Sequence, residues 1–265
     1  MFSAVSFTPD GGTTVTANST INAVGNGLTL GGNLTGSDFA VNKTGAGGLT
    51  LTGETISVGT ITLSEGGVVF STDATQAVSS NLSGSGTLTK LGTGTTTLTG
   101  ALAHSGGTTI SAGTLQLTSA DAVAVGTGGV TLNGGTLALG TGVYDLGDLT
   151  ANSGSIDLLL NSATDFSKLT VGEITSDDYG FLDILDNFGE ALDYKYDIMT
   201  SLPTGVADDF DWNLLLAPDL RGSWSLVSNG SGLTLQGAAS AAVPEPSTWL
   251  LLALGAGLVL WRRKK

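Results

Sequence analysis

The residues that could carry out catalysis are few and widely spaced. The chain contains one histidine, His104, and no cysteine, so neither a two-histidine zinc motif nor a thiolate metal site can form. His104 stands in the phrase "GALAHSGGTT", which is typical of a turn before a strand. We interpret it as a turn residue rather than a general base. The sequence also lacks a Gly-Lys pair, which excludes a phosphate-binding P-loop.

The acidic residues raise two further hypotheses, a calcium loop and a glycan-cleaving pair of carboxylates. The phrase "DDFDWN" (208–213) begins like a calcium loop, but Leu214 stands where Gly is required and Leu220 where Glu is required. We favour solvated acids there and leave a looser calcium site open. Glycan hydrolysis needs two carboxylates that face each other. The acids of the repeat region are isolated instead: Asp38, Glu54, Glu65, Asp73 and Asp121. We predict no catalytic residue, no cofactor and no metal site, and therefore no enzyme.

These isolated residues stand in a chain of short echoes rich in Gly and Thr. "KTGAGGLTLTG" (43–53) returns as "KLGTGTTTLTG" (90–100), and "ETISVGTITL" (54–63) returns as "TTISAGTLQL" (108–117). "GTLQL" at the end of that phrase is echoed by "GTLAL" (135–139), 22 residues later. Each echo alternates apolar and polar residues, as a strand with one buried face does, and Gly clusters separate the echoes.

The spacing of the echoes has a geometric explanation. At about 3.3 Å per residue, about 20 residues can circle a small triangular coil once. Stacked coils then pair equivalent strands in parallel and place Leu, Ile and Val in apolar columns. The sequence therefore predicts an all-β fold, a right-handed parallel β-helix (β-solenoid). Ile56 and Ile110 should occupy corresponding places in it, and Lys43 and Lys90 equivalent corners. A Gly- and Thr-rich antiparallel sandwich is the alternative.

One stretch of the repeat region points to a known family. "LTKLGTGTTTLTGALAHSGGTTISAGTLQL" (88–117) resembles the autotransporter-associated β-strand repeat of bacterial surface and passenger proteins. Its second half, "SGGTTISAGTLQL", is the more specific part. The resemblance implies an extended β-helix that is exposed outside the cell.

Between residues 143 and 237 the composition shifts toward acidic and aromatic residues. "YDIMTSL" predicts a strand, and "GSWSLVSNGSGLTLQG" (222–237) predicts a β-hairpin that turns at "NGSG". A solenoid needs a cap, because its last coil would otherwise expose an apolar cross-section and an unpaired edge. We expect residues 1–142 to form the solenoid and residues 143–237 an acidic β cap or small β-sandwich.

The chain closes on "VPEPSTWLLLALGAGLVLWRRKK". Its apolar run is about 20 Å long as a helix, which is short for a bilayer core of about 30 Å. Bracketing Trp residues suit the two membrane interfaces, and the cations suit the cytoplasmic side. The phrase resembles the PEP-CTERM sorting signal of exopolysaccharide-producing Gram-negative bacteria. The matching positions are the motif Val243, Pro244, Glu245 and Pro246, the transmembrane boundaries Trp249 and Trp261, and the basic tail Arg262, Arg263, Lys264 and Lys265. We expect a linker over 238–248 and the helix with its tail over 249–265.

This resemblance implies an inner-membrane-anchored precursor that an exosortase-type protease cleaves near the Pro-Glu-Pro triplet. The mature protein would then be released to the cell surface or extracellular matrix; a permanent tail anchor is the alternative.

The charge of the chain sets which partners it can have. The formal net charge is −14, which repels phosphate backbones, so we predict no nucleic-acid partner. The sequence predicts an exported structural protein for adhesion or biofilm scaffolding, with extracellular polysaccharide as a further partner. Two alternatives remain open: a carbohydrate-binding or carbohydrate-active β-helix, and a tail-anchored fragment of a longer surface repeat protein.

Overall fold

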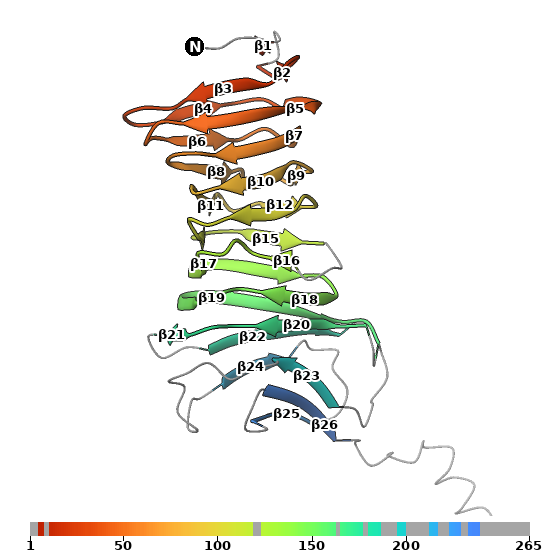
Figure 1. The fold of residues 1–265 in the computed structure, drawn as a ribbon. Coiled ribbons are helices and arrows are strands. Elements are labelled where there is room, and N and C mark those ends of the chain that lie inside the picture. Colours follow the sequence, from red (N-terminus) through yellow and green to blue (C-terminus); the bar gives the residue numbers. More distant parts are fainter. Residues whose placement is uncertain are drawn as a thin grey trace, which may run out of the picture.

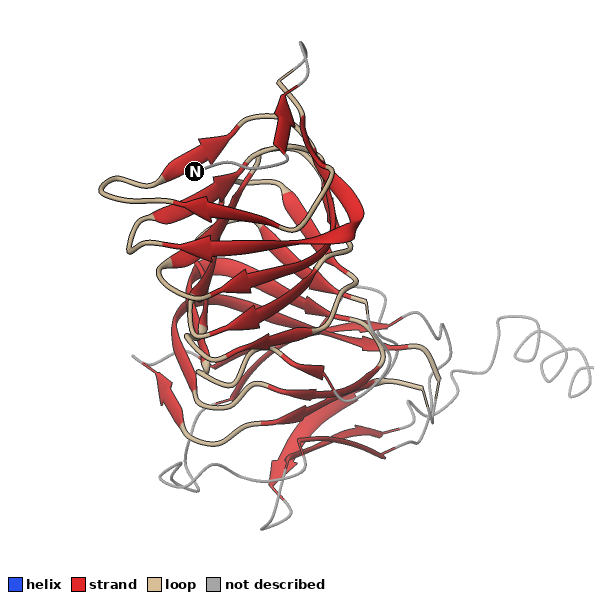
Figure 2. Ribbon diagram, turned by 45° about the horizontal axis from the view of Figure 1, so that its top comes forward, coloured by secondary structure: helices blue, strands red, loops and turns tan. Residues whose placement is uncertain are grey.

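The computed structural model shows a stack of β-strand coils. It describes residues 5–7, 11–118, 123–162, 165–176, 180–186, 195–199, 212–216, 223–228 and 233–238. All regular secondary structure among these residues is β-strand. Figure 1 shows the strands following one another along a single axis in the order of the sequence. In Figure 2 the same coils are seen turned, each winding around that axis. The all-β class and the β-solenoid predicted from the echoes are confirmed.

Each coil has three faces, because the chain crosses three parallel ladders before it returns above its starting point. We number the faces in chain order. Up to residue 158, residues paired in neighbouring coils lie 19 to 22 positions apart, which is the length of one coil. The coils beyond it are longer, with paired residues 25 to 32 positions apart.

The first face contains short strands and the second halves of two long ones. They are β3 (Ser19–Asn22), the end of β5 (Leu34–Thr44), the end of β7 (Thr55–Leu63), β10 (Asn81–Gly84), β13 (Leu102–His104), β16 (Val123–Ala124), β18 (Gly142–Asp145), β20 (Ser167–Thr170) and β23 (Lys195–Met199).

The second face is an unbroken parallel ladder. Its strands are β4 (Leu28–Leu30), β6 (Gly48–Leu51), β8 (Gly67–Ser71), β11 (Thr87–Leu91), β14 (Thr108–Ile110), the start of β17 (Val130–Leu139), the start of β19 (Leu149–Leu160) and β21 (Ile174–Ser176).

The third face is a second unbroken ladder. It comprises β2 (Thr13–Val15), the starts of β5 and β7, β9 (Gln76–Val78), β12 (Thr95–Leu98), β15 (Thr114–Leu117), the ends of β17 and β19, β22 (Gly180–Asp186) and β24 (Trp212–Leu216). At the N-terminal end β1 (Val5–Phe7) adds to β2 in the antiparallel direction.

The core is a set of apolar columns inside the coils. Alternation turns every second residue of a strand inward, and parallel register then places like residues above one another. The longest column on the third face is buried throughout: Leu34, Ile56, Val78, Leu98, Leu117, Leu139 and Leu158. Each such side chain contributes about 1.5–3 kcal/mol to folding through burial. The predicted stacking of "GTLQL" and "GTLAL" is confirmed, because Leu115 pairs with Leu137 and Leu117 with Leu139.

The prediction for Ile56 and Ile110 is wrong. Ile56 pairs with Leu34 on the third face, whereas Ile110 pairs with Lys90 on the second. The second and third faces both contain short alternating strands with Gly residues nearby, so an echoed phrase can return on a different face. Lys43 and Lys90 likewise stand at different corners. Lys43 is the residue before the last of a first-face strand, and Lys90 the residue before the last of a second-face strand.

Close packing between coils leaves no room for side chains at some corners. Gly92 follows β11 with a φ of 74°, and a Cβ there would lie 2.5 Å from the backbone oxygen of Thr72. Gly113, one coil later, has a φ of 60°, and its Cβ would lie 2.5 Å from the oxygen of Gly92. Only glycine adopts this left-handed backbone without strain and allows so close an approach.

The parallel stack continues past residue 142, where the composition changes. β19 pairs in parallel with β17 and with β22, and β22 with β24. The predicted hairpin is confirmed, since β25 (Ser223–Ser228) and β26 (Leu233–Ala238) pair in the antiparallel direction. β26 also pairs antiparallel with β23, the strand expected at "YDIMTSL". The switch from parallel to antiparallel pairing therefore begins at β23, well beyond the boundary expected at 142.

Candidate functional surface

Two of the chemically active side chains, Lys43 and Lys90, are buried at corners of the solenoid. Neither side chain has solvent-exposed surface. Lys43 donates from Nζ to the carbonyl oxygens of Thr44 (3.0 Å), Gly45 (2.6 Å) and Glu65 (3.0 Å). These bonds close the corner after β5 and tie it to the next coil. The ammonium group thus supplies a donor to backbone acceptors of the turning chain; one of them, the carbonyl of Thr44, also accepts from the amide of Ala23 at 2.9 Å.

Lys90 does the same at the corner after β11 with fewer bonds. Its Nζ donates to the carbonyl oxygens of Leu91 (2.6 Å) and Gly92 (2.8 Å). Burial lowers the pKa of both lysines below the ordinary value, and a nearby carboxylate, Glu65 for Lys43 and Asp73 for Lys90, partly opposes the shift. Both lysines are therefore part of the framework of the solenoid.

His104 is the last residue of β13, and its side chain is fully buried. The prediction that it lies in a turn is wrong, because strand alternation turns it inward together with Leu102. Its Nε2 lies 3.0 Å from Oγ1 of Thr108, and that hydroxyl donates to the carbonyl of Val125 at 2.9 Å. The hydroxyl proton is thereby used, so Nε2 carries the ring proton. Nδ1 is buried and has no hydrogen-bond partner among the described residues.

The environment of His104 keeps the imidazole neutral. Burial lowers its pKa below the ordinary value, and the backbone of Gly107 opposes the shift only in part. A general base must reach a substrate proton, and a side chain sealed inside the solenoid cannot do so.

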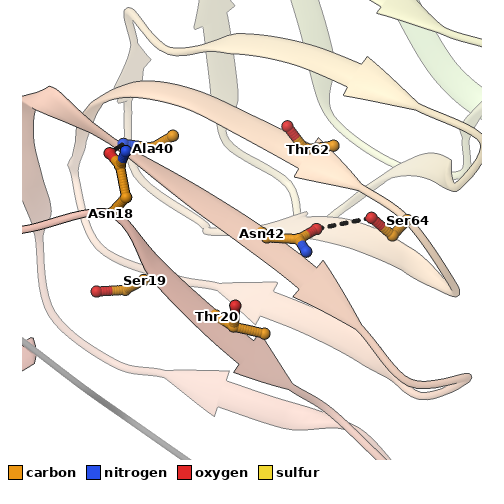
Figure 3. Close-up of a pocket in the computed structure, with 7 residues that line it drawn as sticks. All are labelled: Asn18, Ser19, Thr20, Ala40, Asn42, Thr62 and Ser64. Carbon is orange, nitrogen blue, oxygen red and sulfur yellow. Dashed lines mark hydrogen bonds between the residues drawn. The ribbon is translucent and has the colours of Figure 1, made fainter.

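A shallow polar hollow of about 370 Å³ lies on the first face near the N-terminal end. Figure 3 shows hydroxyl and amide side chains of β3, β5 and β7 around it. Its lining residues are Asn18, Ser19, Thr20, Ala40, Asn42, Thr62 and Ser64. None of them has a charge, so the hollow offers hydrogen bonds but neither an acid nor a base.

Most polar side chains around this hollow are bonded to a neighbouring coil. Asn42 accepts from the hydroxyl of Ser64 at 2.7 Å, the contact drawn in Figure 3, and Asn18 accepts from the amide of Ala40 at 2.9 Å. Asn33 and Asn81 accept in the same way from residues one coil later, at 3.0 and 2.8 Å. The side chains around the hollow therefore act mainly as cross-braces between coils.

Acidic residues do not gather into a metal site within the part of the chain that the structure describes, where no group of three or more His, Asp or Glu is placed to hold an ion. Asp73 stands at a corner, where the backbone amide and hydroxyl of Thr93 bind it and hold the pKa of its carboxyl below the ordinary range. Of the calcium-like phrase, Asn213 lies on β24, and residues 208–211 lie outside the described residues.

The residues assigned to the sorting signal lie outside the described residues as well. These are Val243, Pro244, Glu245, Pro246, Trp249, Trp261, Arg262, Arg263, Lys264 and Lys265. Among the residues that the structure does describe, no helix is long and apolar enough to cross a membrane.

Comparison with protein-family models gives two matches. Residues 88–117 match the passenger-associated-transport-repeat. In the structure this stretch runs from β11 to β15 and folds back above itself, because Leu88 pairs with Thr108 and Leu98 with Leu117. One matched repeat thus contains a complete coil and the start of the next.

The second match covers the C-terminal phrase. Residues 242–264 match the PEP-CTERM protein-sorting motif, which implies processing by exosortase-type machinery. Comparisons with curated proteins and with solved structures find no match. Each family match covers a short part of the chain, and together they confirm both resemblances seen in the sequence. The chain carries passenger-type repeats wound into a β-solenoid and a PEP-CTERM sorting motif, and both point to an exported protein directed to the cell surface.

Proposed function

We propose that this protein is a structural rod of the bacterial surface layer or extracellular matrix, which serves in adhesion or as a biofilm scaffold. The observation that carries the proposal is the combination of a continuous three-faced solenoid with a C-terminal sorting motif. Stacked coils that each bond to their neighbours make a stiff, quasi-one-dimensional object. Such a rod supplies length and exposed side faces, which are the properties a scaffold needs.

A non-enzymatic role is part of the proposal, and the position of the reactive groups supports it. The single histidine and the two corner lysines are buried and engaged with the framework. The polar hollow on the first face is lined by neutral side chains alone. General acid–base chemistry on a glycan would need carboxylates at such a surface.

Sorting and release complete the proposal. The precursor is held in the inner membrane by the segment from Trp249 to Trp261, and an exosortase-type protease cleaves it near Val243–Pro246. Proline residues such as Pro244 and Pro246 disfavour regular helix and favour extended neighbours, and an extended peptide is the form that a protease binds as a strand. The mature rod then leaves the membrane.

The test is mass spectrometry of the protein isolated from its native host. A mature C-terminus between residues 243 and 247 in the surface or matrix fraction is the expected result. A Pro244→Ala/Pro246→Ala variant should retain Lys265 and stay with the inner membrane. Wild-type protein that ends at Lys265 in the membrane would contradict release, and wild-type protein dissolved in the cytosol would overturn the whole proposal.

A further inference from the structure

The second face carries one outward column that differs from all others in composition. Parallel register places one residue of each strand from β4 to β21 directly above the next. The column is Thr29, Thr50, Val69, Thr89, Thr109, Thr131, Thr150 and Thr175. All these side chains are exposed or half-buried, and all are β-branched. We call this column the threonine ladder.

The hydroxyl groups of the ladder have no partner within the described part of the protein. None of its seven threonines makes a side-chain hydrogen bond to another described residue. On the first face, in contrast, Ser83 donates to Thr62. On the third face Thr97 donates to Gln116, and Thr136 bonds to Ser155. Several outward hydroxyls on the other two faces thus brace neighbouring coils, whereas none of the ladder does so, and the whole row remains available to an external ligand.

The shape of the ladder limits what can bind. Strands in a sheet are about 4.8 Å apart, so eight rungs make a straight row about 34 Å long. The row is one side chain wide and offers a few hundred square ångströms, well below the roughly 800 Å² per partner of a stable protein–protein interface. A second copy, which would also bring a further net charge of −14, is therefore a poor occupant. A long, narrow molecule fits the row much better.

The chemistry of the row points to the kind of molecule. Each threonine presents one hydroxyl, which both donates and accepts, beside one methyl group. No rung carries a charge, and the acidic body repels polyanions. β-Branched side chains have few rotamers, so little conformational entropy is lost when a ligand fixes them. A neutral polymer with hydroxyl groups at regular intervals complements each of these properties.

We propose that the threonine ladder binds a neutral polysaccharide chain that lies along the solenoid axis. This inference rests on the proposed function in one respect, since the rod must reach the matrix to meet such a chain. The second face, through the threonine ladder, is then the surface by which the scaffold holds its polymer. Val69 is the one residue of the ladder without a hydroxyl, so a threonine at this position should strengthen binding.

The experiment uses the full-length purified chain in a detergent without a sugar headgroup. Microcrystalline cellulose and insoluble mannan serve as neutral probes and an alginate gel as the anionic one, with bound protein measured by depletion. The test variant is Thr89→Val/Thr109→Val/Thr131→Val, which removes three hydroxyls and retains the β-branched shape. The matched control is Thr62→Val/Thr97→Val/Thr136→Val, which makes the same chemical change on the other two faces. Circular dichroism confirms the fold of both.

We expect wild-type protein to bind at least one neutral probe and to ignore alginate. Loss of three hydroxyl partners should weaken that binding by at least about tenfold, at a few-fold per hydrogen bond. The control variant should bind within about twofold of wild type, and Val69→Thr should bind about two- to fivefold more tightly.

Four results would overturn the inference: no binding to either neutral probe, equal losses in the test and control variants, preference for alginate, or self-association that the test variant abolishes. The last would assign the ladder to a second copy. Protein that is exported and cleaved but fails to bind refutes the ladder alone, whereas protein found in the cytosol refutes the proposed function whatever it binds.

Discussion

Two interior columns of the solenoid show how an apolar core accepts polar groups. On the first face the column is Ile21, Lys43, Leu63, Gly84 and His104. On the second face it is Leu30, Leu51, Phe70, Lys90, Ile110 and Leu132. The second column is apolar except for one rung, whereas the first contains a cation, an imidazole and a glycine among two aliphatic side chains.

The difference lies in what the adjoining corner offers to each polar group. Lys43 bonds three carbonyls, one of them from the next coil, and Lys90 bonds two within its own corner. His104 finds one hydroxyl for two ring nitrogens within the described part of the chain. We infer that a polar side chain inside the solenoid costs less stability when it has more hydrogen-bond partners. The first column holds two such side chains and the second holds one, so the stability of the first column depends more on these hydrogen bonds.

Removal of the lysines should produce the largest effect. Lys43→Ala removes three hydrogen bonds, leaves the carbonyls of Gly45 and Glu65 without the donor they share, and opens a cavity, so it should lower the free energy of unfolding by about 3–5 kcal/mol. Lys90→Ala should cost about 1 kcal/mol less, because it removes two hydrogen bonds rather than three. Urea unfolding of the full-length variants measures both.

The control for these variants is Lys168→Ala. Lys168 is half-buried, with its ammonium 4.9 Å from the ring centre of Phe166, and a contact of this kind contributes about 1 kcal/mol or less. If Lys43→Ala were no more costly than Lys168→Ala, the corner lysines would not be structural.

The corner glycines should give the next largest effect, and two of them form a matched pair. Gly92→Ala forces a side chain into a φ of 74° and against the oxygen of Thr72, beside Lys90. It should cost about 2–4 kcal/mol. Gly25 has a φ of 58°, but a Cβ added there would meet nothing within 4 Å, so Gly25→Ala should cost about 1 kcal/mol. Equal costs in thermal unfolding would show that backbone strain, and not the approach of the preceding coil, decides these positions.

The β-solenoid could be predicted from the sequence because its repeat reflects the physical period of the coil. "GTLQL" and "GTLAL" are 22 residues apart and stack directly. The hairpin of β25 and β26 was equally accessible, since its strands are adjacent in sequence. In both cases a local pattern is sufficient to determine the partner.

The face that each echo occupies could not be predicted in this way. Lys43 and Lys90 begin similar phrases, but their separation is two coils and one additional face, and a Gly follows both lysines within two residues. The burial of His104 could have been found, because alternation places it on the same side of its strand as Leu102. The identity of its partner could not, since Thr108 and Val125 meet it only after a corner and a further coil are complete.

The smallest effect should come from the pH dependence of His104. Because burial depresses its pKa in the folded chain, the unfolded chain takes up a proton near its ordinary value of about 6.5 while the folded chain does not. Protonation therefore favours unfolding. The stability contributed by neutral His104 is complete above about pH 6.5 and declines below it by about 1.4 kcal/mol per pH unit until the folded pKa is reached.

His104→Leu cannot titrate, so the difference in stability between wild type and this variant isolates the histidine from the carboxylates. Urea midpoints between pH 7.5 and 4.5 should move against wild type as the pH falls. If the two curves ran parallel, the protonated imidazole would have to find a hydrogen-bond partner at Nδ1. The polar side chains of the first column would then be as well satisfied as Lys90 is in the second.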